Sequence, residues 1–150
     1  MNSDFKDLLR EFAHAGVEYL IVGGYAVMHY SQPRYTKDLD LWLNPTAENA
    51  RRVTVAFARF GIPLIEIVEA DFARPGTQYV IGREPMQIDF LTSLPGLEFE
   101  ECWGRRQDAR LDEMTIYYLS RNDLRLAKRT AARLRDLADL EELDKFSEPE

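Results

Sequence analysis

The segment from Tyr19 to Leu43 constrains the fold of this chain more strongly than any other part of the sequence. It begins with the apolar run Tyr19-Leu20-Ile21-Val22, and a short apolar run bounded by glycine is typical of a buried strand. Gly23-Gly24 then interrupts the strand, and the composition of residues 25–30 predicts a short helix. The segment therefore predicts a strand, a tight turn and a helix that lead into a second strand.

This second strand, Asp38-Leu39-Asp40-Leu41-Trp42-Leu43, alternates acidic and apolar side chains at its start. Because successive side chains of a strand point to opposite faces, Asp38 and Asp40 share one face. Two carboxylates this close repel each other and raise each other's pKa, which a cation between them would relieve. Carboxylate oxygens suit Mg²⁺, which proteins usually bind through one or two carboxylates together with substrate phosphates. The strand therefore predicts a Mg²⁺ site, with Mn²⁺ as a substitute ion.

The turn before this strand has the features of a phosphate-binding site. Gly23 and Gly24 allow backbone amides to approach a ligand closely, and the start of the following helix adds partial positive charge. Arg34 lies in the loop that leads to Asp38, and a guanidinium can bind a triphosphate through two hydrogen bonds. A solvated loop arginine is an equal alternative for Arg34.

A third carboxylate lies in the segment Met86-Gln87-Ile88-Asp89-Phe90-Leu91-Thr92, which predicts another strand. Asp89 is the acidic residue in the middle of this otherwise apolar strand. A buried carboxylate is costly unless it is paired or binds a metal ion. We favour a metal-binding role for Asp89, and the alternative is a carboxylate bonded to backbone amides at a strand end.

This part of the sequence resembles the signature of the polymerase-β-like nucleotidyltransferase superfamily. The signature consists of an apolar residue, Gly-Gly, thirteen further residues and then Asp-x-Asp with apolar neighbours. The resemblance implies an α/β (α+β) fold, in which helices pack on a small mixed β-sheet. It also implies transfer of a nucleoside monophosphate from an NTP to an acceptor, with release of pyrophosphate. In that family Asp38, Asp40 and Asp89 would be the catalytic metal ligands.

The C-terminal region predicts one long helix from Arg121 to about Leu143. Its segment 128–140 resembles the C-terminal motif of the small bacterial AbiEii-type toxin nucleotidyltransferases. The resemblance implies that Lys128 is catalytic and binds the nucleotide together with Asp136, with Arg133 as a third candidate. The alternative is a solvated charged face.

The remaining segments are expected to support this site. Helices are predicted at 3–15 and 46–60, and strands at 64–68, 77–81 and 114–119, whereas 70–76 and 95–111 are expected to be irregular. We expect a single nucleotidyltransferase-like domain over residues 1–146 and a disordered tail at 147–150.

Composition limits the class of protein. With 150 residues, 45% apolar and 30% charged, the chain has the make-up of one globular domain. The net charge of −7 argues against a general nucleic-acid binder, although RNA could still bind a local basic face. The single cysteine, Cys102, excludes an intrachain disulfide and is expected to be a packing residue. No apolar run is long enough for a membrane span, so we expect a cytoplasmic protein.

Several functional alternatives stay open at this point. The acceptor is RNA, a protein hydroxyl or a small molecule. The chain is shorter than the AbiEii-type toxins and lacks their larger C-terminal lobe, which leaves the acceptor undefined. A second hypothesis is a non-catalytic member of the same fold that binds nucleotide or an antitoxin or other protein partner. A third is an unrelated α/β protein whose Asp-x-Asp is a surface feature.

Overall fold

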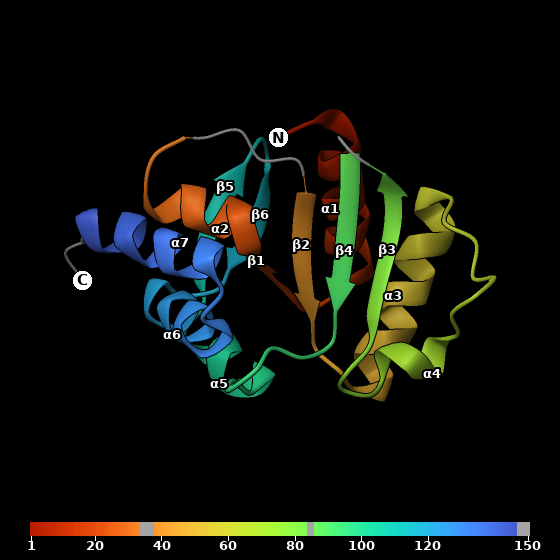
Figure 1. Ribbon diagram of the computed structural model, residues 1–150. Helices are drawn as coiled ribbons and strands as arrows, with labels where there is room; N and C mark the ends of the chain where they lie inside the picture. Colours follow the sequence, from red (N-terminus) through yellow and green to blue (C-terminus); the bar gives the residue numbers. More distant parts are fainter. Residues whose placement is uncertain (34–37, 84–85, 147–150) are drawn as a thin grey trace.

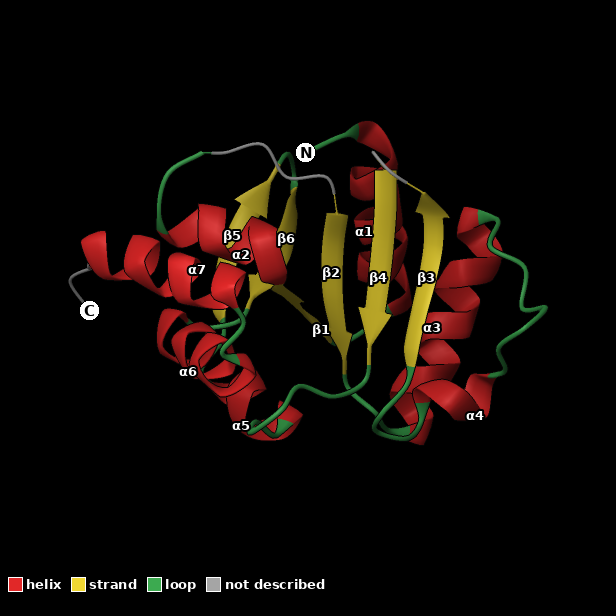
Figure 2. Cartoon of the chain, viewed as in Figure 1, coloured by secondary structure: helices red, strands yellow, loops and turns green. Residues whose placement is uncertain are grey.

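A computed structural model describes residues 1–33, 38–83 and 86–146 (Figures 1 and 2). In these residues the chain forms six strands and seven helices around one sheet. The strands are β1 (Tyr19–Val22), β2 (Asp38–Leu43), β3 (Gln78–Arg83), β4 (Met86–Leu91), β5 (Gln107–Leu111) and β6 (Met114–Tyr118). The helices are α1 (Ser3–Ala15), α2 (Gly23–Tyr30), α3 (Ala47–Phe60), α4 (Glu69–Phe72), α5 (Phe99–Gly104), α6 (Arg121–Ala131) and α7 (Leu134–Lys145).

The sheet is mixed and has the strand order β3-β4-β2-β1-β6-β5. The pairs β1–β2, β3–β4 and β5–β6 are antiparallel, whereas β2–β4 and β1–β6 are parallel. In the parallel pair of β2 and β4, Asp40 lies directly opposite Asp89. The small mixed sheet with helices packed on it confirms the predicted fold class, and the register places two of the predicted metal ligands side by side.

One face of the sheet is covered by α1 and α3, which lie behind β2, β4 and β3 in Figure 1. Leu39 and Leu41 of β2 point to this face and are fully buried. Phe90 of β4 packs against Phe12 of α1 and Phe57 of α3, with ring centroids 6.1 Å and 4.9 Å apart. Because the apolar side chains of β2 and β4 fill this core, their alternating aspartates must lie on the other face.

On that other face, α2, α6 and α7 stand together at one side of the sheet. Figure 2 shows that these helices leave the exposed sides of β2, β4 and β3 uncovered. Side chains from both parts line one cleft, with α6 and α7 on one side and the strands that carry the aspartates on the other. None of the described helices is long and apolar enough to cross a membrane.

Two predicted elements between α3 and β5 are wrong. Residues 64–68 form no strand but part of the surface loop after α3, where Ile65 is 81% exposed and Val68 is 60% exposed. Their apolar side chains resemble those of a strand, but β3 occupies the neighbouring edge of the sheet and pairs with β4. Residues 70–76, expected to be irregular, contain most of the short helix α4.

The prediction that residues 95–111 are irregular is also wrong, because they form α5 and β5. β5 pairs with β6 as a hairpin, and its turn contains Asp112 with a φ of 55°. The polar sequence of β5, Gln-Asp-Ala-Arg-Leu, lacks an apolar strand pattern because this edge strand is largely solvated. Pairing with β6 therefore sets its conformation.

The predicted single helix from Arg121 to Leu143 is two helices. α6 ends at Ala131. The next residue, Ala132, adopts a left-handed conformation with a φ of 53°, and α7 starts at Leu134. The amide of Arg133 donates a hydrogen bond to Oδ2 of Asp136, 3.1 Å away, which caps the start of α7. The chain thus turns sharply between the helices, so that α7 packs back against α6. The predicted tail at 147–150 lies outside the described residues.

Candidate active site

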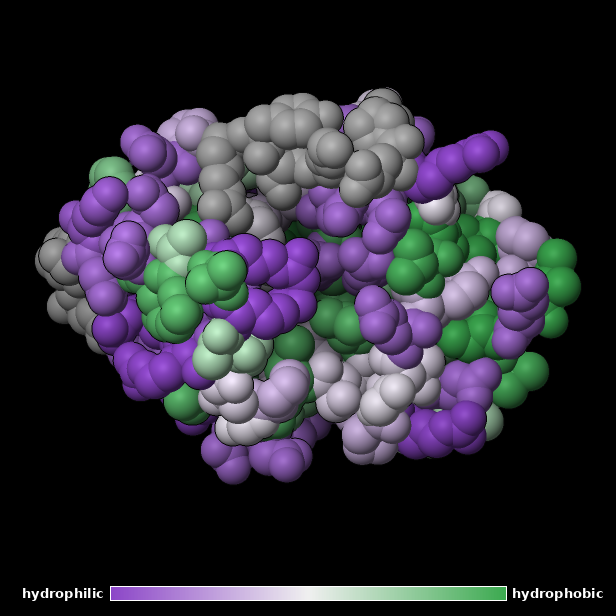
Figure 3. Space-filling model, viewed as in Figure 1, coloured by the Kyte–Doolittle hydropathy of each residue, from purple (hydrophilic) through white to green (hydrophobic). Residues whose placement is uncertain are grey.

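A cleft of about 730 Å³ lies between the β2–β4 part of the sheet and the α6–α7 pair. Figure 3 shows hydrophilic side chains on both sides of this hollow. The size suits a small-molecule ligand. Its polar lining comes from the turn after β1, from the acidic face of the sheet and from the two C-terminal helices. The residues that bring charge or a glycine backbone to it are Gly23, Gly24, Asp38, Asp40, Asp89, Lys128, Arg133, Arg135, Asp136 and Asp139.

Gly23 joins β1 to α2 at the edge of the cleft and touches the acidic strand. Its φ is 67°, a conformation that side chains disfavour, and a β-carbon there would lie 2.0 Å from Oδ2 of Asp40. Both observations require glycine at this position. The turn therefore brings the start of α2 into direct contact with the Asp40 carboxyl group.

Asp40 and Asp89 project from neighbouring strands, and their carboxyl groups are hydrogen-bonded to each other. Burial, this hydrogen bond and the negative charges of Asp89 and Asp38 raise the pKa of Asp40 to about 7, against a smaller lowering by Lys128. Asp40 is therefore partly protonated near neutral pH. A carboxyl group in this state is able to exchange its proton for a cation.

Gln87 orients the third predicted ligand. Its Nε2 donates a hydrogen bond to Oδ1 of Asp89, 3.1 Å away along the same strand. The described side-chain hydrogen bonds include none from a backbone amide to Asp89, so the structural alternative considered for this residue is not observed. Strand alternation places Gln87 on the same face as Asp89, whereas the contact between the two side chains is known only from the structure.

The donor set fits a hard divalent cation, although it is not arranged around a common point. Within the described residues, no three His, Cys, Asp or Glu side chains are already positioned to hold a metal ion. Asp38, Asp40 and Asp89 nevertheless line one cleft, and the first two lie on the same face of β2. Carboxylate oxygens of this type are those that Mg²⁺ prefers, and Asp40 must release its proton to bind the ion.

Lys128 lies across the cleft on α6 and is held by two carboxylates of α7. Its Nζ lies 3.0 Å from Oδ2 of Asp139 and 3.4 Å from Oδ1 of Asp136. The Lys128 side chain is 13% exposed and that of Asp136 is fully buried. The interaction is therefore part of the packing between α6 and α7.

Arg133 also binds Asp136, with its Nε 2.6 Å from Oδ2 and its Nη2 3.3 Å from Oδ1. Burial alone would raise the pKa of Asp136, but the hydrogen bonds from Arg133 and the charge of Lys128 outweigh it and hold this pKa below its ordinary value. Asp136 is thus an ionised carboxylate with two cationic partners. In this structure its oxygens face those partners.

The cleft collects nearly all of the residues predicted to act in the site. Asp38, Asp40 and Asp89 lie on the sheet side, Gly23 and Gly24 at the turn, and Lys128 and Asp136 on the helix side. Arg34 lies outside the described residues. Sequence reasoning assigned no site role to Asp139, Arg135 or the loop residues Ser93, Leu94 and Pro95, which also line the cleft. Asp139 lies three residues after Asp136, a spacing that places both on one side of a helix and could have indicated it, whereas the sequence of the loop carries no such signal.

Cys102 is not part of the cleft. It is fully buried, and burial together with the nearby Asp123 carboxylate raises the pKa of its thiol to about 12. A thiol with such a pKa is protonated and unreactive. The prediction that Cys102 is a packing residue agrees with this environment.

No protein-family model matches the sequence, and no curated protein matches it. Among solved structures, the chain is similar to the lincosamide antibiotic adenylyltransferase LnuA in its lincomycin-bound form. The two share 14% sequence identity and superpose with a TM-score of 0.57 over 98% of each chain. At this identity the similarity establishes the fold. The chain therefore has the nucleotidyltransferase fold that its sequence predicted, over nearly its whole length, whereas a closer relation to the AbiEii-type toxins stays a prediction.

Proposed function

We propose that the protein is a metal-dependent nucleotidyltransferase, which transfers a nucleoside monophosphate from an NTP to a hydroxyl group of an acceptor. One observation carries this proposal: the carboxyl groups of Asp40 and Asp89 share a hydrogen bond beside the Gly23 turn. Paired carboxylates next to a glycine-rich helix start are the two halves of a site for a metal-bound phosphate chain. The fold shared with an adenylyltransferase supports the same chemistry.

In the proposed reaction, Asp38, Asp40 and Asp89 hold Mg²⁺, which when bound neutralises charge on the phosphates and activates the acceptor hydroxyl. Backbone amides of Gly23 and Gly24 bind the phosphate chain. The acceptor oxygen forms a bond to the α-phosphorus while the bond from that phosphorus to the bridging α–β oxygen breaks. Pyrophosphate leaves, and the proton of the acceptor hydroxyl passes to solvent water.

The acceptor is to be sought among three classes. The sequence leaves RNA, protein hydroxyls and small molecules open as acceptors, and an antitoxin partner belongs to the non-catalytic alternative. Small hydroxylated compounds gain support from the similar structure, which is an antibiotic adenylyltransferase bound to lincomycin. The cleft volume of about 730 Å³ is sufficient for a nucleotide and leaves an acceptor to approach from its open side.

The decisive experiment is incubation of the protein with each α-labelled NTP, Mg²⁺ and a cell extract or a panel of small hydroxylated compounds. Label should move to an acceptor with wild-type protein and fail to move with Asp89→Asn. If MgNTP binds but no acceptor in any class becomes labelled, the non-catalytic binding protein is the better description. If neither binding nor transfer occurs, the proposal is wrong.

A further inference from the structure

The cations of the cleft differ in what they bind, and this difference assigns them different roles. Three cationic side chains of the described residues line the cleft, and all come from α6, α7 and the turn between them: Lys128, Arg133 and Arg135. Lys128 and Arg133 are both occupied by carboxylates of α7. Their charge is therefore largely neutralised inside the protein.

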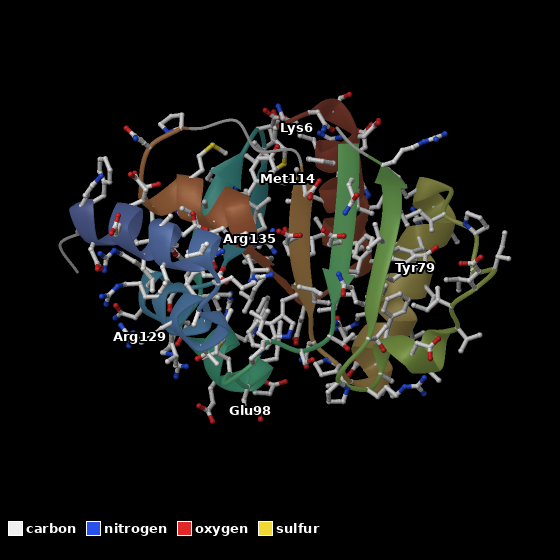
Figure 4. The ribbon with its side chains drawn as sticks, in the orientation of Figure 1. Lys6, Tyr79, Glu98, Met114, Arg129 and Arg135 are labelled. Carbon is white, nitrogen blue, oxygen red and sulfur yellow. The ribbon has the colours of Figure 1, made fainter. Side chains whose placement is uncertain are left out.

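Arg135 is the exception. Within the described part of the chain it forms no ion pair or side-chain hydrogen bond, although it lines the same cleft and its side chain is exposed. Figure 4 shows Arg135 at the start of α7, on the side of the helix that faces β2. Its guanidinium thus keeps its full charge and five donor N–H groups for a ligand.

The opposite side of the cleft indicates what this ligand is. Asp38, Asp40 and Asp89 lie there beside the glycine turn, so a cationic ligand would be drawn to the sheet and away from Arg135. A metal-bound polyphosphate is the ligand that satisfies both sides, because its metal binds the carboxylates and its terminal oxygens remain anionic. A guanidinium binds such oxygens through two parallel hydrogen bonds.

We propose that Arg135 binds the phosphate chain of the NTP, while Lys128 and Arg133 hold Asp136 and so fix the turn that presents Arg135. This inference rests on the proposed function and adds the residue that recognises the polyphosphate. It differs from the expectation that Lys128 makes this contact, since Lys128 is already held by Asp136 and Asp139. The position of Arg135, one residue before Asp136, couples its placement to that ion-pair network.

The test compares Arg135→Ala with wild-type protein in two binding measurements: the dissociation constant of MgNTP, and competition by magnesium tripolyphosphate. Arg135→Ala should weaken both by at least about tenfold, or about 1.4 kcal/mol. Arg135→Lys keeps the charge but loses the paired geometry, so its binding should be intermediate. The melting temperature without ligand should stay unchanged, because Arg135 has no described partner to lose.

Arg129→Ala is the matched control, since Arg129 is an exposed arginine of α6 that does not line the cleft. It should change either constant by less than about twofold. The inference would be overturned by unchanged binding in Arg135→Ala, or by equal losses of binding in both arginine variants. The proposed function would survive those outcomes if Asp40→Asn abolished MgNTP binding. Failure of the wild-type protein to bind any MgNTP would refute both.

Discussion

A methyl group on the α-carbon of Gly23 would lie 2.0 Å from Oδ2 of Asp40, so the turn after β1 and the acidic strand β2 fit together only without a side chain at position 23. Gly23→Ala should therefore destabilise the protein by about 2–4 kcal/mol, through the left-handed backbone and the clash. It should also displace Asp40 and remove MgNTP-dependent stabilisation. Urea unfolding with and without MgNTP measures both effects.

Gly16→Ala is a suitable control, because it measures the free-energy cost of a side chain on a left-handed backbone without the clash. Gly16 has a similar φ of 73°, but a β-carbon there would meet nothing closer than 4.0 Å. We expect a loss of about 1–2 kcal/mol with nucleotide binding preserved. Equal losses and intact MgNTP binding in both variants would show that the contact with Asp40 is unimportant.

Asp40→Asn should leave the stability of the folded protein intact but abolish the stabilisation by MgNTP. An asparagine amide can donate to Asp89, as the protonated Asp40 does, and it removes one of the crowded negative charges. The melting temperature without ligand should be unchanged or higher at about pH 8, while the stabilisation by MgNTP disappears. Asp7→Asn, on the exposed side of α1, controls for general loss of charge. A large loss of stability without ligand would instead identify a structural aspartate.

The raised pKa of Asp40 predicts an unusual dependence of stability on pH. The folded pKa is about 7 and the ordinary value is 3.8, so the folded protein holds a proton that the unfolded chain releases between these values. The contribution of Asp40 is fully present below the unfolded pKa, and it is lost as pH rises through the folded pKa at about 1.4 kcal/mol per pH unit. Chemical denaturation across this range, with Asp40→Asn as the comparison, should isolate this contribution.

The affinity for Mg²⁺ should rise with pH, whereas the contribution of Asp40 to stability falls. Because the ion displaces the proton on Asp40, the apparent affinity for Mg²⁺ should rise with pH and level off above about pH 7. Titration of Mg²⁺ in the presence of NTP at several pH values measures this trend. An affinity for Mg²⁺ that does not change over this range would exclude Asp40 as a ligand that must lose a proton.

Lys128→Ala should cost stability even without ligand. Exposed ion pairs contribute at most about 1 kcal/mol, but the Lys128 side chain is only 13% exposed and its partner Asp136 is fully buried. Removing the lysine leaves two carboxylates with one partner fewer, so a loss of about 1–3 kcal/mol is expected. Urea unfolding of Lys128→Ala, Asp139→Asn and the double variant should give losses that are less than additive.

Arg129→Ala again supplies the comparison, because Arg129 follows Lys128 on α6 and its side chain is exposed. It should change stability by less than about 0.5 kcal/mol. If Lys128→Ala behaved like Arg129→Ala, the ion pairs with Asp136 and Asp139 would be too weak to hold α6 and α7 together.

The sheet side of the site was predictable because its signals are local. Alternation along β2 places Asp38 and Asp40 on one face, and an aspartate inside an apolar strand marks Asp89. What alternation cannot supply is which strands are neighbours. The parallel pairing that puts Asp40 opposite Asp89 joins residues far apart in the chain and depends on the core formed with α1 and α3.

The helix side was predictable in composition but not in geometry. The periodicity of residues 121–143 continues across the break, and alanine at position 132 favours a helix, so nothing local indicates the turn. The left-handed Ala132 is stabilised by contacts that form only when α7 folds back, among them those of Lys128 with Asp136 and Asp139. Tertiary interactions outweigh local propensity here.

The left-handed residue between α6 and α7 bears on how relatives of this chain could be recognised. Lys128 and Asp139 are eleven residues apart, which is about 16 Å along a continuous helix, yet their charged groups lie 3.0 Å apart. Insertion of one residue between them would turn α7 by about 100° and separate the pair. Descendants of a common ancestor should therefore preserve the interval from the lysine to both aspartates. At position 132 they should carry residues that tolerate a positive φ, such as glycine or asparagine, even where the rest of the helical sequence has diverged.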